Sequence, residues 1–314
     1  MGLLRGPSSL ALLRDNMSTE ENAYFLGSRF DTGSIEEAAC NILAEIRGRF
    51  RYVVTPNVQH IVRLLEDPAT MRPLYEGAWR VYCDSRVLSR LALVSGHRIP
   101  VITGSDLTAE LITRAAKQRL TIAVIGPTRA VCARLQDKYP GLDVTVHTPQ
   151  MGFIKSKFEV QKCVDFVVKT QAPLVFLAVG MPQQEILANH IADHPQAQGV
   201  GLCIGASIDF LTGEQRRAPI WLQKAGLEWL HRLLSDPKRL ARRYLIECPR
   251  IFYFISLEWR KSIAGLQFPV RLESSSNGSS RTHWWVAAMA KRKFAAGAGP
   301  DLAPAASAKP RKLP

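Results

Sequence analysis

Between residues 50 and 206, short apolar runs alternate with amphipathic segments. Several runs are apolar throughout, which is typical of parallel strands covered on both faces. We expect strands at Tyr52–Thr55, Val81–Cys83, Pro100–Thr103, Thr121–Ile125, Asp143–His147, Leu174–Val179 and Val200–Ile204. Helical spacing predicts helices at Asp106–Gln118, Arg129–Lys138, Lys157–Thr170 and Pro182–His194. The alternation predicts an α/β fold, a Rossmann-like, mostly parallel sheet with helices on both faces.

The pattern changes after Gly213, where strand-like runs cease. Helical spacing there predicts two long helices, Pro219–Leu234 and Pro237–Ile263, with Asp236 as the cap of the second. Residues 214–261 hold 11 Lys and Arg against 5 Asp and Glu. The sequence therefore predicts a basic C-terminal helical appendage on the sheet domain.

These changes divide the chain into four parts. We expect a flexible N-terminus (1–22), an α/β catalytic domain (23–213), the appendage (214–264) and a disordered basic tail (265–314). The tail is rich in Ser, Gly, Ala and Pro, a composition that cannot bury a core.

The net charge of +14 attracts polyanions, which include nucleic acid, anionic membrane surfaces and phosphorylated substrates. No apolar run approaches the roughly 20 residues that span a bilayer. The six cysteines are scattered and never form C-x-x-C, a usage typical of a reducing compartment. We therefore expect a cytoplasmic protein without disulfides or structural zinc.

Ligands of parallel sheets bind at the carboxyl ends of the strands, so the residues that follow each predicted strand are the candidate site. Glycines there let a ligand approach the backbone, and helices that begin after them favour phosphate. The polar residues and glycines at these positions are Thr55, Asn57, Asp84, Thr103, Gly104, Ser105, Asp106, Gly126, Gly180, Gln184, Glu185 and Asp209.

Asp84 is the first candidate for a catalytic base. It follows an apolar strand, and partial burial would raise its pKa toward the range that suits removal of a proton from a hydroxyl. The alternative is that Asp84 caps the helix beginning at Ser85. Asp106 has a similar alternative as a cap or first-turn acid, and Thr55 and Asn57 either anchor a sugar or phosphate or satisfy turn backbone.

Other polar residues also leave two interpretations open. Glu185 and Asp209 could hydrogen-bond a ribose or sugar hydroxyl, or could compensate a helix dipole. His190 and His194 have the i, i+4 spacing of metal ligands. The chain offers them neither an H-E-x-x-H motif nor a third ligand, which favours a solvated pair and no metal site.

Arginines of the appendage recur at intervals of seven and three residues, at Arg232, Arg239 and Arg242. A guanidinium group suits bidentate capture of phosphate oxygens. The final helix adds Tyr244 and Trp259 beside further arginines, a pattern of helices that lie in a membrane interface. The alternative is a helix that packs its apolar stripe on the domain.

Missing motifs exclude several classes of protein. No G-x-G-x-x-G follows a strand and no G-x-x-x-x-G-K-[ST] occurs, which disfavours dinucleotide-dependent dehydrogenases and P-loop NTPases. The chain also lacks Asp-x-Asp, the metal-chelating pair of many nucleotide-sugar transferases. If the substrate is a sugar diphosphate, arginines and backbone amides would have to stabilise its leaving group.

The chain resembles the WecG/TagA/CpsF family of bacterial glycosyltransferases (glycosyltransferase family 26). The resemblance runs from about Phe25 to Tyr244 and is specific because several blocks occur in the family's order. The matching blocks are Thr55-Pro56-Asn57, Asp84, Thr103–Leu107, Gly152-Phe153, Gly180–Glu185, Gly205–Gly213, Arg217-Ala218-Pro219 and Gly226–Arg243.

The resemblance implies inverting, metal-independent transfer of a sugar from a UDP-sugar onto a polyprenyl-diphosphate-linked saccharide in cell-surface or exopolysaccharide synthesis. The expected donor sugar is N-acetylmannosamine, its uronic acid or glucose, and no cofactor is implied. Asp84 matches the family's general base, with Thr55 and Asn57 beside it.

The family's arginines that hold the lipid diphosphate correspond to Arg232, Arg239 and Arg242, and Gly152 joins the residues that bind the donor. The resemblance further implies that the appendage docks on the inner face of the cell membrane and that the protein self-associates. We therefore expect a cytoplasmic, peripherally membrane-associated enzyme.

Two departures leave the donor sugar open: Ser85 stands where many relatives have Gly, and Gln183 stands where many have Lys. A competing hypothesis is a noncatalytic basic protein that binds membrane or nucleic acid. The positive charge is concentrated in the appendage and tail, and the chain carries no recognised nucleic-acid module, so we expect no specific nucleic-acid partner.

Overall fold

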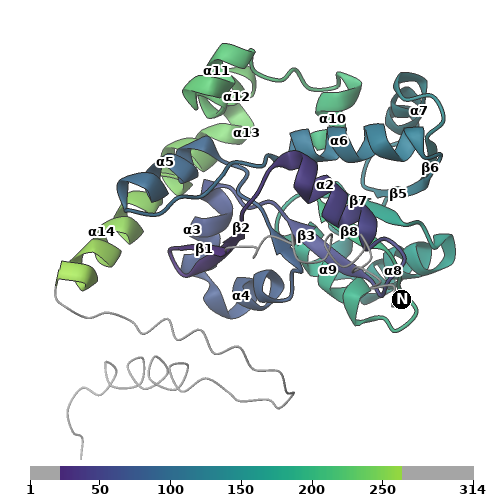
Figure 1. Ribbon diagram of the computed structural model, residues 1–314, viewed down its shortest axis with the longest axis horizontal. Coiled ribbons are helices and arrows are strands. Elements are labelled where there is room, and N and C mark those ends of the chain that lie inside the picture. The colour runs from purple at the N-terminus through teal and green to yellow at the C-terminus, as the bar shows by residue number, and fades with distance from the viewer. Residues whose placement is uncertain (1–21, 264–314) are drawn as a thin grey trace, which may run out of the picture. The chain divides into compact units, whose positions relative to one another are not determined.

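The computed structural model describes residues 22–263, and a six-stranded parallel sheet with strand order β4-β3-β8-β7-β5-β6 lies at its centre (Figure 1). The strands are β3 (Arg51–Val54), β4 (Arg80–Val81), β5 (Thr121–Ile125), β6 (Asp143–His147), β7 (Leu174–Leu177) and β8 (Val200–Cys203). All the pairings between them are parallel, which confirms the predicted α/β fold.

Helices cover both faces of the sheet and form two cores (Figure 1). Successive strand residues point to opposite faces, so Val53 joins one core and Val54 the other. One face is covered by α3 (Val58–Glu66), α4 (Pro68–Glu76), α8 (Lys157–Thr170) and α9 (Gln183–Asp193). The other face is covered by α2 (Ile35–Ala44), α6 (Gly104–Lys117), α7 (Arg129–Lys138) and α10 (Ser207–Thr212).

A short antiparallel hairpin, β1 (Asn22–Phe25) and β2 (Ser28–Asp31), precedes the sheet and was not predicted. Its two-residue turn has positive φ at both Leu26 (51°) and Gly27 (71°), which matches the right-handed strand twist. Asp31 fixes the hairpin to the sheet edge, because its carboxylate accepts hydrogen bonds from the Arg80 guanidinium (2.9 Å) and the Val81 amide (2.7 Å).

One predicted strand is wrong. Within Pro100–Thr103, only Val101 pairs, through a single bridge to Cys83 beyond the end of β4. The segment cannot extend because α6 begins at Gly104 and Pro100 has no amide hydrogen to donate to a ladder. Two further elements of the domain are α5 (Arg86–Val94) and the 3₁₀ turn η1 (Phe153–Lys155).

Neither predicted long helix of the appendage is continuous. Gly226, at φ 75°, ends α11 (Ile220–Ala225), and α12 (Glu228–Ser235) begins two residues later. Asp236 caps the next helix as expected, through an acceptor bond from the Arg239 amide (3.3 Å). That helix is α13 (Pro237–Ala241), followed by the π-helical turn η2 (Arg242–Glu247) and by α14 (Arg250–Ile263). Pro249 lies at the second break and has no amide hydrogen to continue the ladder.

The appendage packs part of its apolar stripe on the domain. Ile251 and Ile255 are buried in the core that also contains residues of α3, whereas Phe252 and Tyr253 are about 60% exposed. Packing on the domain is therefore confirmed for Ile251 and Ile255, and the membrane-interface interpretation of the exposed side chains stays a prediction. Among residues 22–263, no helix combines the length and apolar character needed to cross a membrane. The terminal parts predicted at 1–22 and 265–314 lie, apart from Asn22, outside the described residues.

Candidate active site

Asp84 lies between β4 and α5, at the carboxyl edge of the sheet. Its Oδ1 accepts a hydrogen bond from the Gly104 amide (3.1 Å), while Ser85 caps α5 through the Leu88 amide (3.1 Å). The alternative of Asp84 as the cap of α5 is therefore wrong. Burial raises the pKa of Asp84 to about 7, with Glu228 also raising it and Arg232 opposing. A carboxyl group with this pKa is suited to accept a proton near neutral pH.

Thr55 and Asn57 stand beside Asp84 because β3 and β4 are neighbours. The Thr55 hydroxyl donates to the Cys203 carbonyl of β8 (3.3 Å). A Cβ atom on Gly104 would lie 2.8 Å from the Thr55 Oγ1, so only glycine lets α6 begin this close to β3. Asn57 caps α3 by accepting from the Gln59 amide (3.1 Å).

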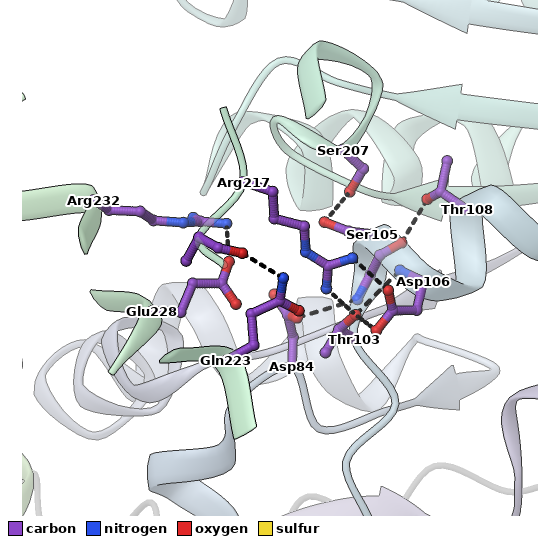
Figure 2. A network of polar contacts seen from close by, with 12 residues as sticks. Asp84, Thr103, Ser105, Asp106, Thr108, Ser207, Arg217, Gln223, Glu228 and Arg232 are labelled. Carbon is purple, nitrogen blue, oxygen red and sulfur yellow. Dashed lines mark hydrogen bonds and ion pairs between the residues drawn. The ribbon is translucent and has the colours of Figure 1, made fainter. Parts of the chain in front are cut away.

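A second carboxylate, Asp106, forms a polar network at the start of α6 (Figure 2). Thr103 caps α6 by accepting from the Asp106 amide (3.1 Å), and its hydroxyl donates to Asp106 Oδ2 (2.7 Å). Arg217 Nη1 donates to Asp106 Oδ1 (2.5 Å). Burial acts to raise the pKa of Asp106, but the hydrogen bonds from Arg217 and Thr103 outweigh it and lower the pKa. Asp106 is thus a first-turn acid, as the alternative interpretation held.

A cavity of about 1000 Å³ opens along the carboxyl ends of the strands. It is bounded by the turns after β7 and β8, where Gly180 and Gly205 have positive φ and no atom lies within 4 Å of an added Cβ. The predicted residues that line this larger cavity are Thr55, Asn57, Asp84, Ser105, Gly180, Gln184, Asp209, Arg232 and Arg239.

Gln184 and Glu185 play different parts at the start of α9. Gln184 Oε1 accepts from the Gly205 amide (2.9 Å) and so holds the turn after β8. Its Nε2 donates to Glu185 Oε1 (2.9 Å). Glu185 is 1% exposed and its pKa is raised to about 7 by burial. It lies behind the cavity wall rather than in it, with His60 Nε2 3.7 Å from its Oε1.

Several other predicted residues do not line the larger cavity. Gly126 has φ 130°, and a Cβ there would lie 2.6 Å from the Ala178 carbonyl oxygen, so this glycine serves close packing beside β7. Gly152 begins η1, and the Arg242 side chain is 82% exposed beside Glu247. None of these three residues borders either cavity described here.

A smaller cavity of about 300 Å³ lies between the domain and the appendage. Thr103 borders it, together with residues that the sequence analysis did not single out as site residues: Arg217, Glu228, Trp229, Arg243, Tyr244 and Phe252. Four side chains border both cavities, namely Asn57, Asp84, Arg232 and Arg243. Asp84 therefore borders two neighbouring cavities.

The four side chains that border both cavities form the wall between them, and they include Arg232 and Arg243, whereas Arg217 borders the smaller cavity alone. The Nε atoms of Arg217, Arg232 and Arg243 are buried and have no hydrogen-bond partner among the described residues. The Arg243 guanidinium lies over the Tyr244 ring at 5.3 Å, and that of Arg232 over Phe210 at 4.7 Å. This wall is suited to bind an anion, because arginine donors are strongest toward phosphate oxygens.

The sequence indicates Arg243 only as one of two equally supported candidates, the other being Arg242. Arg242 and Arg243 lie three and four residues after Arg239, and both spacings fall on the same helical face. Spacing alone therefore cannot choose between them. Within the described part of the chain, no three His, Cys, Asp or Glu side chains converge as a metal site requires.

Comparison with protein families gives one match that covers most of the chain. The model of the glycosyl transferase WecG/TagA/CpsF family matches residues 23–264, which include the sheet, both cavities and the described appendage. The family supports a nucleotide-sugar donor, a lipid-linked acceptor and a role in cell-surface polysaccharide synthesis. The chain belongs to the WecG/TagA/CpsF family and is a glycosyltransferase.

Proposed function

We propose that this enzyme transfers a sugar, with inversion, from a UDP-sugar to a hydroxyl of a polyprenyl-diphosphate-linked saccharide. One observation carries the proposal: Asp84 and Asn57 border both cavities, with Arg232 and Arg243 beside them. A base shared by two binding spaces suits a reaction in which one substrate supplies the electrophile and the other the hydroxyl.

The larger cavity is the proposed donor site. Its volume of about 1000 Å³ accommodates a ligand of nucleotide-sugar size. The open glycine turns at Gly180 and Gly205 leave room for a phosphate group beside the backbone. Gln184 and Asp209 provide polar groups for the sugar or ribose, and Arg239 provides positive charge at the rim.

The smaller cavity is the proposed acceptor site. Trp229, Tyr244 and Phe252 provide apolar wall, and Arg217, Arg232 and Arg243 provide buried donors. Such a combination suits a ligand that joins a diphosphate to a prenyl chain. We therefore assign the lipid diphosphate to Arg232 and Arg243, in preference to the exposed Arg242 and to Arg239, which borders the larger cavity alone.

Catalysis in this proposal centres on Asp84. Its carboxylate removes the proton from the acceptor hydroxyl while that oxygen forms a bond to the anomeric carbon. The bond from the anomeric carbon to UDP breaks on the opposite face, and its electron pair goes to the β-phosphate oxygen. Arginines and backbone amides stabilise the charge that develops there, and neither a metal ion nor a cofactor is assigned a role.

The proposed place of action is the cytoplasmic face of the cell membrane. Leu245 on η2 and Tyr253 and Trp259 on α14 expose between 47% and 61% of their surface, and Arg250 and Arg260 are exposed on the same helix. Aromatic and aliphatic side chains interspersed with arginines suit an anionic bilayer surface. A basic surface without a bilayer-crossing helix among the described residues supports peripheral attachment.

The test measures UDP release by the purified protein with a panel of UDP-sugars, a prenyl-diphosphate-linked saccharide and EDTA. We expect release with one donor that depends on the acceptor and persists in EDTA. Asp84→Asn should lower kcat by about 10²–10⁴, as loss of a general base does. Near-normal turnover by this variant would refute the role of Asp84, and loss of release in EDTA would refute the metal-free assignment.

Membrane attachment has its own test, which is flotation with vesicles of anionic and of neutral lipid. The double variant Leu245→Ser and Trp259→Ser should bind anionic vesicles less well than the parent protein. Phe158→Ser removes an aromatic residue from α8 that is more exposed (69%) than Trp259 (47%) and serves as the control. Equal flotation of all three proteins would contradict membrane docking through the appendage.

A further inference from the structure

We propose that Glu228 is a positioning residue for the transfer reaction: its carboxylate holds the Arg232 guanidinium at the wall between the cavities, beside Asp84. The inference rests on the proposed function of Asp84 as the general base. Glu228 and Asp84 both border the smaller cavity and lie near each other in the polar network of Figure 2.

The position of Glu228 is fixed by α5, the helix that begins two residues after Asp84. Arg90 of α5 donates to the carbonyls of Ala225 (2.6 Å) and Lys224 (3.0 Å), the last two residues of α11. Gly226 then turns the chain with φ 75°, and a Cβ there would lie 2.7 Å from Arg90 Nη1. Glu228 starts α12 directly after this turn, so the contacts of Arg90 connect the start of α12 to the helix that follows Asp84.

Glu228 in turn fixes Arg232. Its Oε1 accepts from Arg232 Nη2 at 3.0 Å, one turn along α12. The guanidinium also lies over the Phe210 ring of α10, 4.7 Å from its centroid. The two side chains of the pair are about 30% exposed, so the pair is partly shielded from water. Without Glu228, Arg232 would lose the one carboxylate paired with it among the described residues.

Besides burial, four neighbouring groups change the pKa of Asp84. Arg232, the Gly104 amide and Arg217 lower its pKa, and Glu228 raises it. These groups come from α12, the start of α6 and the segment before α11. Glu228 is the one carboxylate among them and offsets the cations. A carboxyl group with a higher pKa is a stronger base for the acceptor hydroxyl.

The first measurement is a titration that needs no turnover. Carboxyl carbons of Asp and Glu are labelled with ¹³C in the full chain, and the Asp84 signal is identified by its loss in Asp84→Asn. We expect the pKa of Asp84 to fall by about one pH unit in Glu228→Gln and to rise in Arg232→Met. Glu110→Gln is the matched control, because Glu110 and Arg114 form the same i, i+4 pair on α6 with similar exposure, away from both cavities.

The second measurement is the pH profile of kcat/KM for the same proteins. The acid limb should move down by about one pH unit in Glu228→Gln, with a several-fold loss of kcat at high pH, and should stay in place in Glu110→Gln. Glu228→Asp keeps the charge, so its acid limb should lie close to that of the parent protein. Opposite movements in Glu228→Gln and Arg232→Met are a signature that loss of fold cannot produce.

Two results would overturn the inference while the proposed function stands. One is an Asp84 titration and an acid limb that do not move in Glu228→Gln. The other is a raised KM for the acceptor with an unmoved limb, which would make Glu228 a ligand of the acceptor saccharide. Full activity of Asp84→Asn would instead refute the general base itself, so the two failures are distinguishable.

Discussion

Replacing the candidate base Asp84 with Asn should weaken catalysis and stabilise the fold at the same time. Ionising the half-buried carboxylate is costly because desolvation raises its pKa to about 7. Asn has nearly the same shape, and its side-chain oxygen can still accept the Gly104 amide hydrogen. The substitution therefore removes the charge and keeps the contact.

The expected gain follows from linkage between ionisation and folding. Each pKa unit corresponds to about 1.4 kcal/mol, so a rise from 3.8 to about 7 sets an upper limit of about 4 kcal/mol. Asp84 is half-buried and borders two open cavities, and screening by water reduces the effect. We expect the free energy of unfolding of Asp84→Asn to exceed that of the parent by about 1–2 kcal/mol at pH 8.

The pH dependence has a definite sign. The folded-state pKa is raised, so the parent protein loses stability relative to the variant as the pH rises from the unfolded pKa of Asp, near 4, to about 7. Above pH 7 the difference should be constant, and below pH 4 it should vanish. Urea unfolding of both proteins at several pH values measures it. This account of Asp84 would be refuted if the variant were less stable than the parent at pH 8, or if the difference in their free energies of unfolding were the same at every pH.

Three further variants test the site and the appendage. Arg243→Lys should raise KM for the acceptor about tenfold, whereas Arg242→Lys should leave it unchanged, and equal effects would refute the choice of Arg243. Gly104→Ala brings a Cβ within 2.8 Å of Thr55 Oγ1, so kcat should fall and the free energy of unfolding drop by about 1–3 kcal/mol; unchanged kcat would contradict the close approach. Ile251→Ala, at a 1% exposed position, should cost about 2–5 kcal/mol in urea unfolding, and a smaller cost would mean that α14 is not anchored there.

Regular strands and helices could be predicted from the sequence because each has a local signature. The apolar run Thr121–Ile125 and the helical spacing of Lys157–Thr170 give β5 and α8 with the observed bounds. A local sequence pattern does not predict the structure correctly where the backbone conformation depends on contacts with other parts of the chain. Val101 and Ile102 resemble a strand, but Val101 has a single bridging partner, and Gly226 interrupts a continuous helical pattern with a positive φ.

The residues of the candidate site likewise include some that the sequence could predict and others that depend on distant contacts. Asp84 could be selected because strand ends of a parallel sheet converge on one edge, whatever the details of packing. The Arg217 and Asp106 pair joins residues 111 positions apart, and only the path of the chain after β8 brings them together. The sequence left Glu185 either as a ligand of a sugar hydroxyl or as an acid that compensates the dipole of α9, and it could not show that α9 packs so closely on β3 and β8 that Glu185 is buried.

Helix α3 makes the appendage poorly interchangeable between relatives. Its first turn holds Asn57 at the wall between the cavities, and its outer face holds the appendage: Gln59 donates to Glu247 (2.7 Å), and Arg250 donates to Glu66 (2.6 Å). A chimera that takes only residues 214–263 from a homologue would inherit half of this interface. Grafting α3 together with the appendage transfers both halves, so residues 57–66 and 214–263 form one unit of exchange.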